Sequence, residues 1–579
     1  MSVLEKLPCS LPNTPVPEDI DVSGVAKGFE RILQDLNSSN LTTNAIWRDV
    51  FALTGSTRTF YLADTVSEKW TSLTRLLECG AFEYKQGSAK TMRMGDESAW
   101  VEARYTFEVI AKPARTCTAM LSLVLEAGEW KIWVIRTILD QLRGHPNVDR
   151  LNPDPTSIAA GQSAAGSTSE ANNFECAIIG AGQAGLSVAG RLKALGVSYV
   201  VLEKNQAVGD NWRLRYESTK PHLPFDRTFP DHYPVFLTKY DLAKGYSDWA
   251  GKFGINVWLG TTLQSGQWHA DQKVWDLRLL RNGKETAVKA THVVMAVGAG
   301  GQIPVMPTYP GADKFRGVIL HSGEYDSAGA WKGKNGIVVG TANTAHDVAD
   351  DMLEAGLSSV TMVQRSPTYV LPCEYFLKIT EDTYNTTSDT DNSDMMSLTG
   401  PLAVARLMSN IALNGMARAE PDRFDALEKA GFRVIRYGDI IYQLFERFGG
   451  HYMDVGASAK IAKGLIKIKS DALPTSYTED GLLFDDGTEL KADAIVHATG
   501  FVGNLRDVVR DIFGDEVSAR VEDFWGLDSE GEIKGAFKAS GQPQLWFHGG
   551  PCGHARYFSR FVALQIRAEL DGVPLLGRN

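Results

Sequence analysis

Two stretches of the chain alternate between short apolar runs and an amphipathic segment in the same order. The first covers residues 174–204 and the second covers residues 335–365. A buried strand, an amphipathic helix and a second buried strand form the crossover unit of parallel sheets. The pattern therefore predicts an α/β protein with two Rossmann-like dinucleotide-binding domains.

The first 150 residues show a different pattern. An amphipathic stretch at 25–36 is followed by three long strand-like runs between residues 100 and 142, joined by short turns. This order predicts a separate, smaller α+β domain over residues 1–150. The pattern resembles the SnoaL-like, or nuclear-transport-factor-like, cone, in which a curved sheet wraps around helices. We see no convergent set of catalytic polar residues in it, which favours a packing role.

Composition predicts the remaining boundaries. Residues 151–173 are rich in Pro, Ser, Ala, Gly and Thr, which is typical of a flexible linker. We expect the first dinucleotide domain over 174–330, the second over 331–495 with a helical insertion at about 375–450, and the C-terminal part of the first domain over 496–579. The chain has 579 residues, enough for several domains.

The insertion contains an amphipathic stretch at 401–419. Such a helix can cover an active site or lie on a membrane, and its modest basic content favours a packed lid. No apolar run approaches the ~20 residues that cross a bilayer, and the first 20 residues do not have the pattern of a secretory signal. The six cysteines are widely scattered, which suits a reducing compartment. We therefore expect a cytoplasmic protein.

The net charge of −11 argues against a nucleic-acid partner. It does not exclude phosphate ligands, because backbone amides and a few local cations bind them. We expect a small-molecule substrate and leave open whether the chain forms a homodimer.

The turn of the first crossover has the sequence GAGQAG, which matches the GxGxxG fingerprint. Its three glycines permit a tight turn, close approach of a pyrophosphate, and close packing of helix on strand. An acid follows the next strand, where it binds ribose hydroxyls and repels a 2′-phosphate. This favours FAD or NAD over NADP. The predicted cofactor contacts are Gly180, Gly182, Gln183, Ala184, Gly185 and Glu203.

The turn of the second crossover departs from the pattern. Ala342 replaces the middle glycine and Ala345 replaces the last, which fits either a cofactor that moves or a site that no longer binds. Arg365 follows the next strand, where a guanidinium can grip the 2′-phosphate of NADP. We therefore expect NADPH here. The predicted contacts are Gly340, Asn343, Thr344 and Arg365.

Between the crossovers, residues 315–325 read FRGVILHSGEY and match FxGxxxHxxxY, the fingerprint of flavin-containing monooxygenases. The segments at 209–224, 237–239, 365–372 and 498–501 resemble plant YUCCA-type flavin monooxygenases. The resemblance covers residues 174–570 apart from the insertion. It implies that Trp212, Thr499 and Gly500 lie at the cofactors.

The resemblance also implies the chemistry. NADPH reduces FAD, and O2 forms a flavin C4a-(hydro)peroxide that passes one oxygen atom to a small organic substrate. Lys220 and His222 then belong near the flavin, and His321, beside Ser322, has a positioning role between the two domains. The Gly-rich turn at 548–554 suits the pyrimidine edge of the flavin. Its two histidines and one cysteine do not favour a metal site.

Three alternatives bear on this reading. A flavin disulfide reductase needs a cysteine pair beside the flavin, and no such pair occurs. A Baeyer–Villiger monooxygenase and a non-catalytic nucleotide-binding scaffold stay open. The substrate is open too, because Cys373 stands where YUCCA-type proteins usually have arginine, and the insertion is large.

Overall fold

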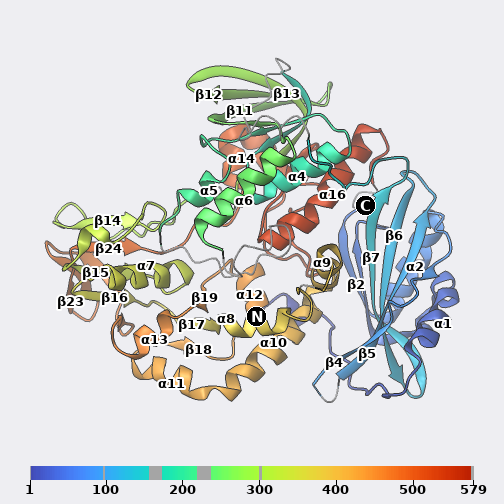
Figure 1. The fold of residues 1–579 in the computed structure, drawn as a ribbon, viewed down its shortest axis with the longest axis horizontal. Helices are drawn as coiled ribbons and strands as arrows, with labels where there is room; N and C mark the ends of the chain where they lie inside the picture. The colour runs from blue at the N-terminus through green and yellow to red at the C-terminus, as the bar shows by residue number, and fades with distance from the viewer. Residues whose placement is uncertain are drawn as a thin grey trace.

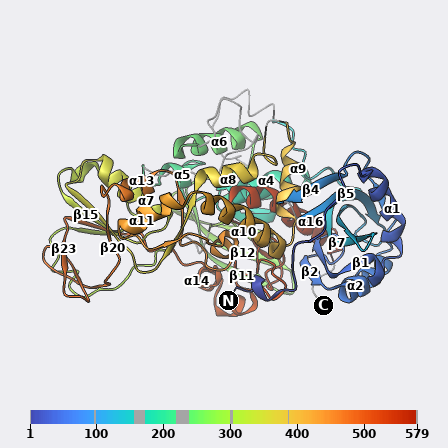
Figure 2. The ribbon, with the colours of Figure 1, turned by 90° about the horizontal axis from the view of Figure 1, so that it is seen from below.

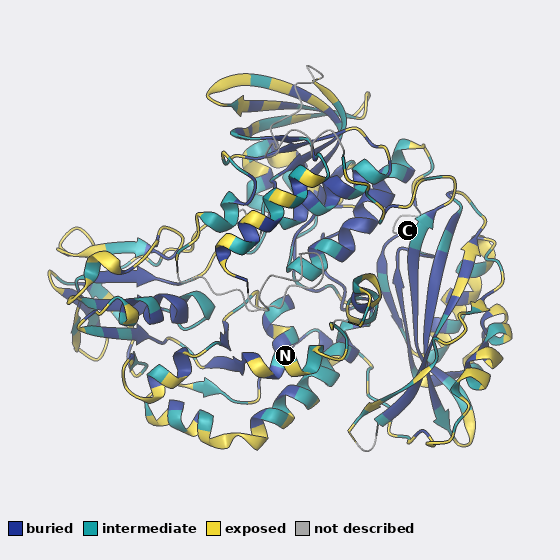
Figure 3. Ribbon diagram, in the orientation of Figure 1, coloured by how far each residue is buried: buried dark blue, intermediate teal, exposed yellow. Residues whose placement is uncertain are grey.

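The computed structural model describes residues 2–95, 98–154, 172–217, 237–298, 303–385 and 387–575. The molecule is elongated, with the N-terminal domain at one end and the second dinucleotide domain at the other (Figures 1 and 2). The first dinucleotide domain and the insertion lie between them. Buried residues follow the sheets and the long C-terminal helix, while exposed residues gather on the outer faces of the helices (Figure 3).

The N-terminal domain is a seven-stranded sheet with two helices against it. The strands run β2-β1-β7-β6-β5-β3, with β4 paired to β5, and only the β1–β7 pair is parallel. The described elements are α1 (Val22–Gln34), β1 (Leu41–Val50), β2 (Thr57–Tyr61), α2 (Ala63–Leu76), β3 (Glu83–Tyr84), β4 (Lys90–Met94), β5 (Ser98–Val109), β6 (Arg115–Glu126) and β7 (Glu129–Leu142).

Large aromatic side chains fill the space between this sheet and its helices. Trp47 of β1 lies against Trp70 of α2, with ring centroids 5.2 Å apart. The buried Asp49 accepts hydrogen bonds from the backbone of Leu53 and from the hydroxyls of Thr54 and Thr137. Because its oxygens are occupied in this way, Asp49 is a structural carboxylate.

The first dinucleotide domain is built on the sheet β10-β9-β8-β13-β12-β11, with β25 paired to β13. Strands β8, β9, β10 and β25 join it in parallel, and β11–β13 form an antiparallel meander. Its elements are β8 (Asn173–Ile179), α4 (Gln183–Ala194), β9 (Tyr199–Leu202), α5 (Asp210–Arg213), α6 (Lys239–Lys252), β10 (Val257–Trp258), β11 (Thr261–His269), β12 (Val274–Arg281), β13 (Lys284–Met295), α14 (Arg506–Phe513), α15 (Asp515–Arg520), β25 (Leu545–Phe547) and α16 (Cys552–Leu570).

The second dinucleotide domain has a five-stranded parallel sheet in the order β14-β24-β15-β16-β20. Its elements are β14 (Val318–His321), β15 (Asn335–Val339), α7 (Asn343–Glu354), β16 (Ser359–Val363), β20 (Lys467–Lys469) and β24 (Ala494–His497), with a small sheet of β21 (Pro474–Tyr477), β22 (Gly481–Phe484) and β23 (Glu489–Lys491) beside it. The pairing of β14 with β24 places the start of this domain before Val318, not at 331 as the sequence pattern suggested.

The insertion folds around a three-stranded parallel sheet, β18-β17-β19. Its elements are β17 (Thr368–Pro372), α8 (Cys373–Thr380), α9 (Thr390–Leu398), α10 (Leu402–Ala419), α11 (Pro421–Lys429), β18 (Val434–Ile435), α12 (Ile440–Phe445), β19 (His451–Asp454) and α13 (Ala457–Ala462). The predicted amphipathic helix is α10, which packs on α8 and α12 and reaches the N-terminal domain through Val404. None of the described helices is long and apolar enough to cross a membrane.

The N-terminal domain docks on the rest of the chain through the outer face of its sheet. The Arg48 guanidinium makes two hydrogen bonds to the Glu532 carboxylate, at 2.7 and 2.9 Å, and both side chains are almost fully buried. Arg58 pairs with Glu530 close by. A buried pair of this kind requires close packing around it, because each charge is costly without its partner. Most of the predicted linker lies outside the described residues.

Candidate active site

The turn of the first crossover has the geometry that a dinucleotide needs. Gly180 has φ +103°, and a Cβ there would lie 2.6 Å from the carbonyl oxygen of Ala296. At Gly185 a Cβ would lie 1.8 Å from the carbonyl oxygen of Gly180, so helix and strand pack closely only with glycine. The first turn of α4, which begins at Gln183 after Gly182, has no side-chain cap. Its N–H groups are therefore suited to a phosphate.

Glu203 lies at the end of β9 and is 6% exposed. One carboxylate oxygen accepts a hydrogen bond from the N–H of Ala181 at 2.7 Å, and the other accepts one from Asn205 at 2.9 Å. A carboxylate has about four acceptor positions, so capacity for ribose hydroxyls remains. Glu203 therefore both braces the turn and fits the ribose of FAD.

The C-terminal Gly-rich turn lies beside the first crossover. Gln183 donates a hydrogen bond to the carbonyl of Gly550 at 2.9 Å, and its other amide atom contacts the thiol of Cys552. The predicted contact Ala184 is buried in the same helix turn. Trp212 lies on α5, and its buried indole N–H has no partner among the described residues. These groups surround the place where the first cofactor would lie.

The turn of the second crossover repeats the first. Gly340 has φ +127°, and a Cβ there would lie 2.4 Å from the carbonyl oxygen of Ala498. Helix α7 follows Ala342 and also has no side-chain cap. The side-chain oxygen of Asn343 accepts a hydrogen bond from the N–H of Met453 at 2.7 Å, so it anchors the turn to β19. Thr344 faces Tyr216, whose hydroxyl donates to Asp347 at 2.9 Å.

Arg365 lies just beyond β16 and is exposed. Its backbone carbonyl accepts a hydrogen bond from Arg433, and no carboxylate of the described residues pairs with its guanidinium. A free guanidinium at the carboxyl end of this strand fits the 2′-phosphate of NADP, while the residues of the first turn fit FAD.

His321, Thr499 and Gly500 meet where the chain passes between the two domains. His321 accepts the N–H of Gly323 at Nδ1 and donates from Nε2 to the carbonyl of Gly500 at 3.1 Å. The hydroxyl of Thr499 donates to the carbonyl of Val305 at 2.6 Å. Burial lowers the pKa of His321, and both of its nitrogens are occupied. These bonds suit His321 to the positioning role expected from the sequence.

Lys220 and His222 lie outside the described residues. The other predicted contacts are distributed over two turns and one connection between the domains. The sequence reasoning missed two features. It did not identify the Tyr216 hydroxyl bridge, and it did not identify the cavity described next. Neither has a local motif.

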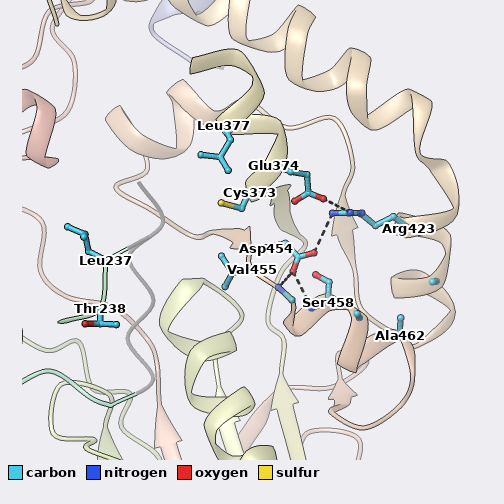
Figure 4. Close-up of a pocket in the computed structure, with 13 residues that line it drawn as sticks. Leu237, Thr238, Cys373, Glu374, Leu377, Arg423, Asp454, Val455, Ser458 and Ala462 are labelled. Carbon is cyan, nitrogen blue, oxygen red and sulfur yellow. Dashed lines mark hydrogen bonds and ion pairs between the residues drawn. The ribbon is translucent and has the colours of Figure 1, made fainter. Parts of the chain in front are cut away.

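A cavity of about 770 Å³ lies between the start of α6, the insertion and the β19–α13 loop (Figure 4). Apolar side chains line much of it, including Leu237, Leu377 and Val455. Its charged lining residues are Glu374, Arg423 and Asp454. It thus contacts both the first dinucleotide domain and the insertion.

Comparison with known proteins identifies the group to which these features belong. Residues 174–387 match the flavin-binding monooxygenase-like family. Over these residues the chain is similar to this family. The family match begins after the N-terminal domain, whose predicted SnoaL-like character stays a prediction.

Two plant monooxygenases are similar to this chain in sequence. The probable indole-3-pyruvate monooxygenase YUCCA3 of Arabidopsis thaliana is 28% identical over 353 residues, which cover 58% of this chain and 76% of the relative. The indole-3-pyruvate monooxygenase YUCCA8 of Oryza sativa subsp. indica is 27% identical over 392 residues, covering 65% and 84%.

Among solved structures, a cyclohexanone monooxygenase mutant from Rhodococcus sp. Phi1 bound to NADP+ is similar with a TM-score of 0.50 and 16% identity. The match covers 69% of this chain and 86% of that one. This likeness concerns the fold, which has two dinucleotide-binding domains in both proteins.

Proposed function

We propose that this protein is an NADPH- and O2-dependent FAD monooxygenase. In the net reaction NADPH, a proton, O2 and the substrate yield NADP+, water and the substrate with one added oxygen atom. The bound flavin supplies the oxygen chemistry. The observation that carries the proposal is that α4 and α7 both begin without a side-chain cap. Each follows a turn whose first glycine, Gly180 or Gly340, has no room for a side chain.

The protein side chains bind and orient the reactants. Glu203 is suited to the ribose of FAD, and the N–H groups of the first turn of α4 are suited to its pyrophosphate. Arg365 is suited to the 2′-phosphate of NADPH, which Glu203 would repel from the first site. The assignment of one nucleotide to each turn follows from these opposite charges.

The hydrogen bonds at His321 hold the connection between the two domains. Its nitrogens bind backbone groups of Gly323 and Gly500, so this side chain joins the end of β14 to the segment after β24, through which the chain leaves the second domain. Such positioning matters for hydride transfer, which requires the two cofactor rings to be in contact.

The cavity beside α6 is the proposed binding site for the organic substrate. Its size suits a small ligand, since pockets for such molecules are usually about 300–1,000 Å³. Its largely apolar wall suits an organic substrate.

Anaerobic titration tests the proposal. The purified protein should carry FAD, and NADPH should bleach the flavin absorbance. On admission of air, each substrate molecule oxygenated should consume one NADPH and one O2. A protein that binds FAD but is never bleached by NADPH is a nucleotide-binding scaffold, and the proposal is then wrong.

A further inference from the structure

The charged groups of the cavity bear on its ligand. The Arg423 guanidinium is 2.5 Å from a carboxylate oxygen of Glu374, 3.3 Å from one of Glu420 and 3.8 Å from one of Asp454. Three carboxylates thus surround one cation. Arg423 is already paired, so it is not available to bind the carboxylate of a ligand.

Among the described residues that line the cavity, two carboxylates face one guanidinium, which gives these residues a net charge of −1. Asp454 is 8% exposed, and its Oδ1 also accepts the N–H of Gly456 at 2.9 Å. Ser458, 4% exposed, lines the same wall, and its hydroxyl has no partner among the described residues. An unpartnered buried hydroxyl in a cavity wall is suited to a ligand hydrogen bond.

We propose that this cavity takes an apolar organic molecule that is neutral or cationic, and that its charges reject a carboxylate. The substrate class would then differ from the 2-oxo acid named for the plant relatives. The statement that this ligand is the substrate rests on the proposed function. The statement that the cavity binds it does not. Like charges in a partly buried site repel strongly, since water screens them less.

Equilibrium dialysis with two probes that share an indole ring tests the charge preference. The oxidised holoprotein without NADPH should bind tryptamine at least tenfold more tightly than indole-3-pyruvate. Glu374→Gln should shift this ratio at least fivefold toward the acid, because it removes one carboxylate from the lining and the nearest charged partner of Arg423. Glu381→Gln, just after the same helix and outside the cavity lining, should leave the ratio unchanged.

Ala459→Trp tests whether the probes bind in this cavity. Ala459 is exposed on the cavity wall, so a bulky ring is tolerated there and should weaken binding of both probes. Equal or tighter binding of indole-3-pyruvate, an unchanged ratio in Glu374→Gln, or unchanged binding in Ala459→Trp would each overturn the inference. If the binding preference holds but no oxygenation occurs, the proposed function fails and the cavity assignment stands.

A second inference rests on contacts of the N-terminal domain with α9. Arg48 donates to the backbone carbonyls of Leu398 and Gly400 at 2.9 and 2.8 Å. Arg136 reaches the hydroxyl of Thr399. On a third strand of the same sheet, Arg104 donates to the side chain of Asn392. Three arginines of one sheet thus contact α9 and the residues that follow it. Figure 1 shows α9 beside this sheet.

Helix α9 in turn holds the start of α16. Asp394 is 1% exposed and accepts two hydrogen bonds from the Arg556 guanidinium, at 2.8 and 2.7 Å. Arg556 belongs to the first turns of α16, directly after the Gly-rich turn. Bidentate pairs of this kind fix orientation as well as position.

We infer that the N-terminal domain acts through α9 and Asp394 to position the start of α16 against FAD. Arg48 is then a positioning residue. The N-terminal domain thus has a role outside its own interior, which is filled by packed aromatic rings and the structural carboxylate of Asp49.

A double-mutant cycle on the FAD dissociation constant tests this coupling. Arg48→Lys keeps a charge for Glu532 but loses the fork that reaches Leu398 and Gly400, and it should weaken FAD binding three- to tenfold. The double variant Arg48→Lys with Asp394→Asn should raise the FAD dissociation constant by less than the product of the two single-variant fold-changes. Arg58→Lys loses the forked hydrogen bonds to Glu530 and does not touch α9. It should leave FAD binding unchanged, alone and in combination with Asp394→Asn.

Hydrogen exchange of the peptide containing residues 552–560 in the apoprotein is the second readout. It should be faster in Arg48→Lys and unchanged in Arg58→Lys. If Arg48→Lys does not fold, Arg104→Lys tests a second contact between the sheet and α9, the one with Asn392. Unchanged FAD affinity and exchange in a folded variant, or fully multiplicative effects in the Arg48 cycle, would refute the inference.

Discussion

Gly340 lies so close to Ala498 that a Cβ at Gly340 would be 2.4 Å from the Ala498 carbonyl oxygen. Gly180 has the same relationship to Ala296, at 2.6 Å. The two crossover turns therefore share their first glycine and its constraint. They differ at the close-approach position, where the first has Gly182 and the second has Ala342.

This difference predicts the effect of exchanging the two residues. Ala342→Gly removes a methyl group from the surface that faces the NADP pyrophosphate and should tighten NADP+ binding by roughly three- to tenfold, about 1 kcal/mol. Isothermal titration calorimetry measures the change. Gly182→Ala is the reciprocal control and should weaken FAD binding, because its Cβ would lie 3.3 Å from the side chain of Asn211. Unchanged NADP+ affinity in Ala342→Gly would show that the methyl group does not face the cofactor.

Arg365 should determine the preference for NADPH over NADH. Its guanidinium is exposed and has no carboxylate partner among the described residues, so Arg365→Ala removes a free charge. Hydrogen bonds to charged groups contribute about 1.5–3 kcal/mol, so the preference should fall by roughly 10- to 100-fold. Stopped-flow reduction rates with both nucleotides measure it. Arg316→Ala is the control, because Arg316 is exposed on the same domain but pairs with Glu479. A variant that keeps its preference would exclude Arg365 from the 2′-phosphate site.

Glu203→Gln should lower both FAD occupancy and stability. One carboxylate oxygen accepts from Ala181 and the other from Asn205, and an amide would turn an N–H group toward one of these donors. A buried group left without a partner costs about 1–3 kcal/mol. Thermal unfolding with and without added FAD separates the two effects. Glu285→Gln, on an exposed position of β13, should change neither quantity. A normal unfolding temperature for the Glu203 variant would contradict its bracing role.

Buried histidines should make the protein labile to mild acid. Burial lowers the pKa to about 3 or 4 at His292, His346, His497, His548 and His554. The unfolded chain binds protons at its ordinary histidine pKa of about 6.5, whereas the folded chain does not, so stability falls as the pH drops from about 6.5 toward 4. Thermal unfolding at pH 7.5, 6 and 5 measures the slope.

Four carboxyl groups act in the opposite direction. Burial raises the pKa of Glu569 to about 7 and that of Asp140 to about 6, and it also raises the pKa of Asp49 and Asp391, so each favours the folded state as the pH falls. With His321, whose pKa burial also lowers, six histidines oppose these four carboxyls, which leaves a net loss of stability. His346→Phe should reduce this loss of stability, because it removes one titrating group. The phenyl ring can keep the stacking on Tyr452, where the ring centroids are 3.6 Å apart. An unfolding temperature that stays constant or rises between pH 6.5 and 5 would contradict the prediction.

The predicted domain boundary at residue 331 was wrong for a physical reason. Strand β14 has only four residues, and its local pattern does not say which sheet it joins. Its partner is β24, in which Ile495 is opposite Ile319, far along the chain. A boundary that depends on such a pairing cannot be read from a local window.

The sequence by itself determined the two crossover turns. Their glycines, their helix starts and the opposite charges of Glu203 and Arg365 are local requirements that any folded neighbourhood must respect. The cavity with its paired Arg423, and the contacts of Arg48 and Asp394 around α9, depend on the folded chain. They join residues from 49 positions apart, for Arg423 and Glu374, to 484 apart, for Arg48 and Glu532. Their energies come from burial and pairing after the chain has folded.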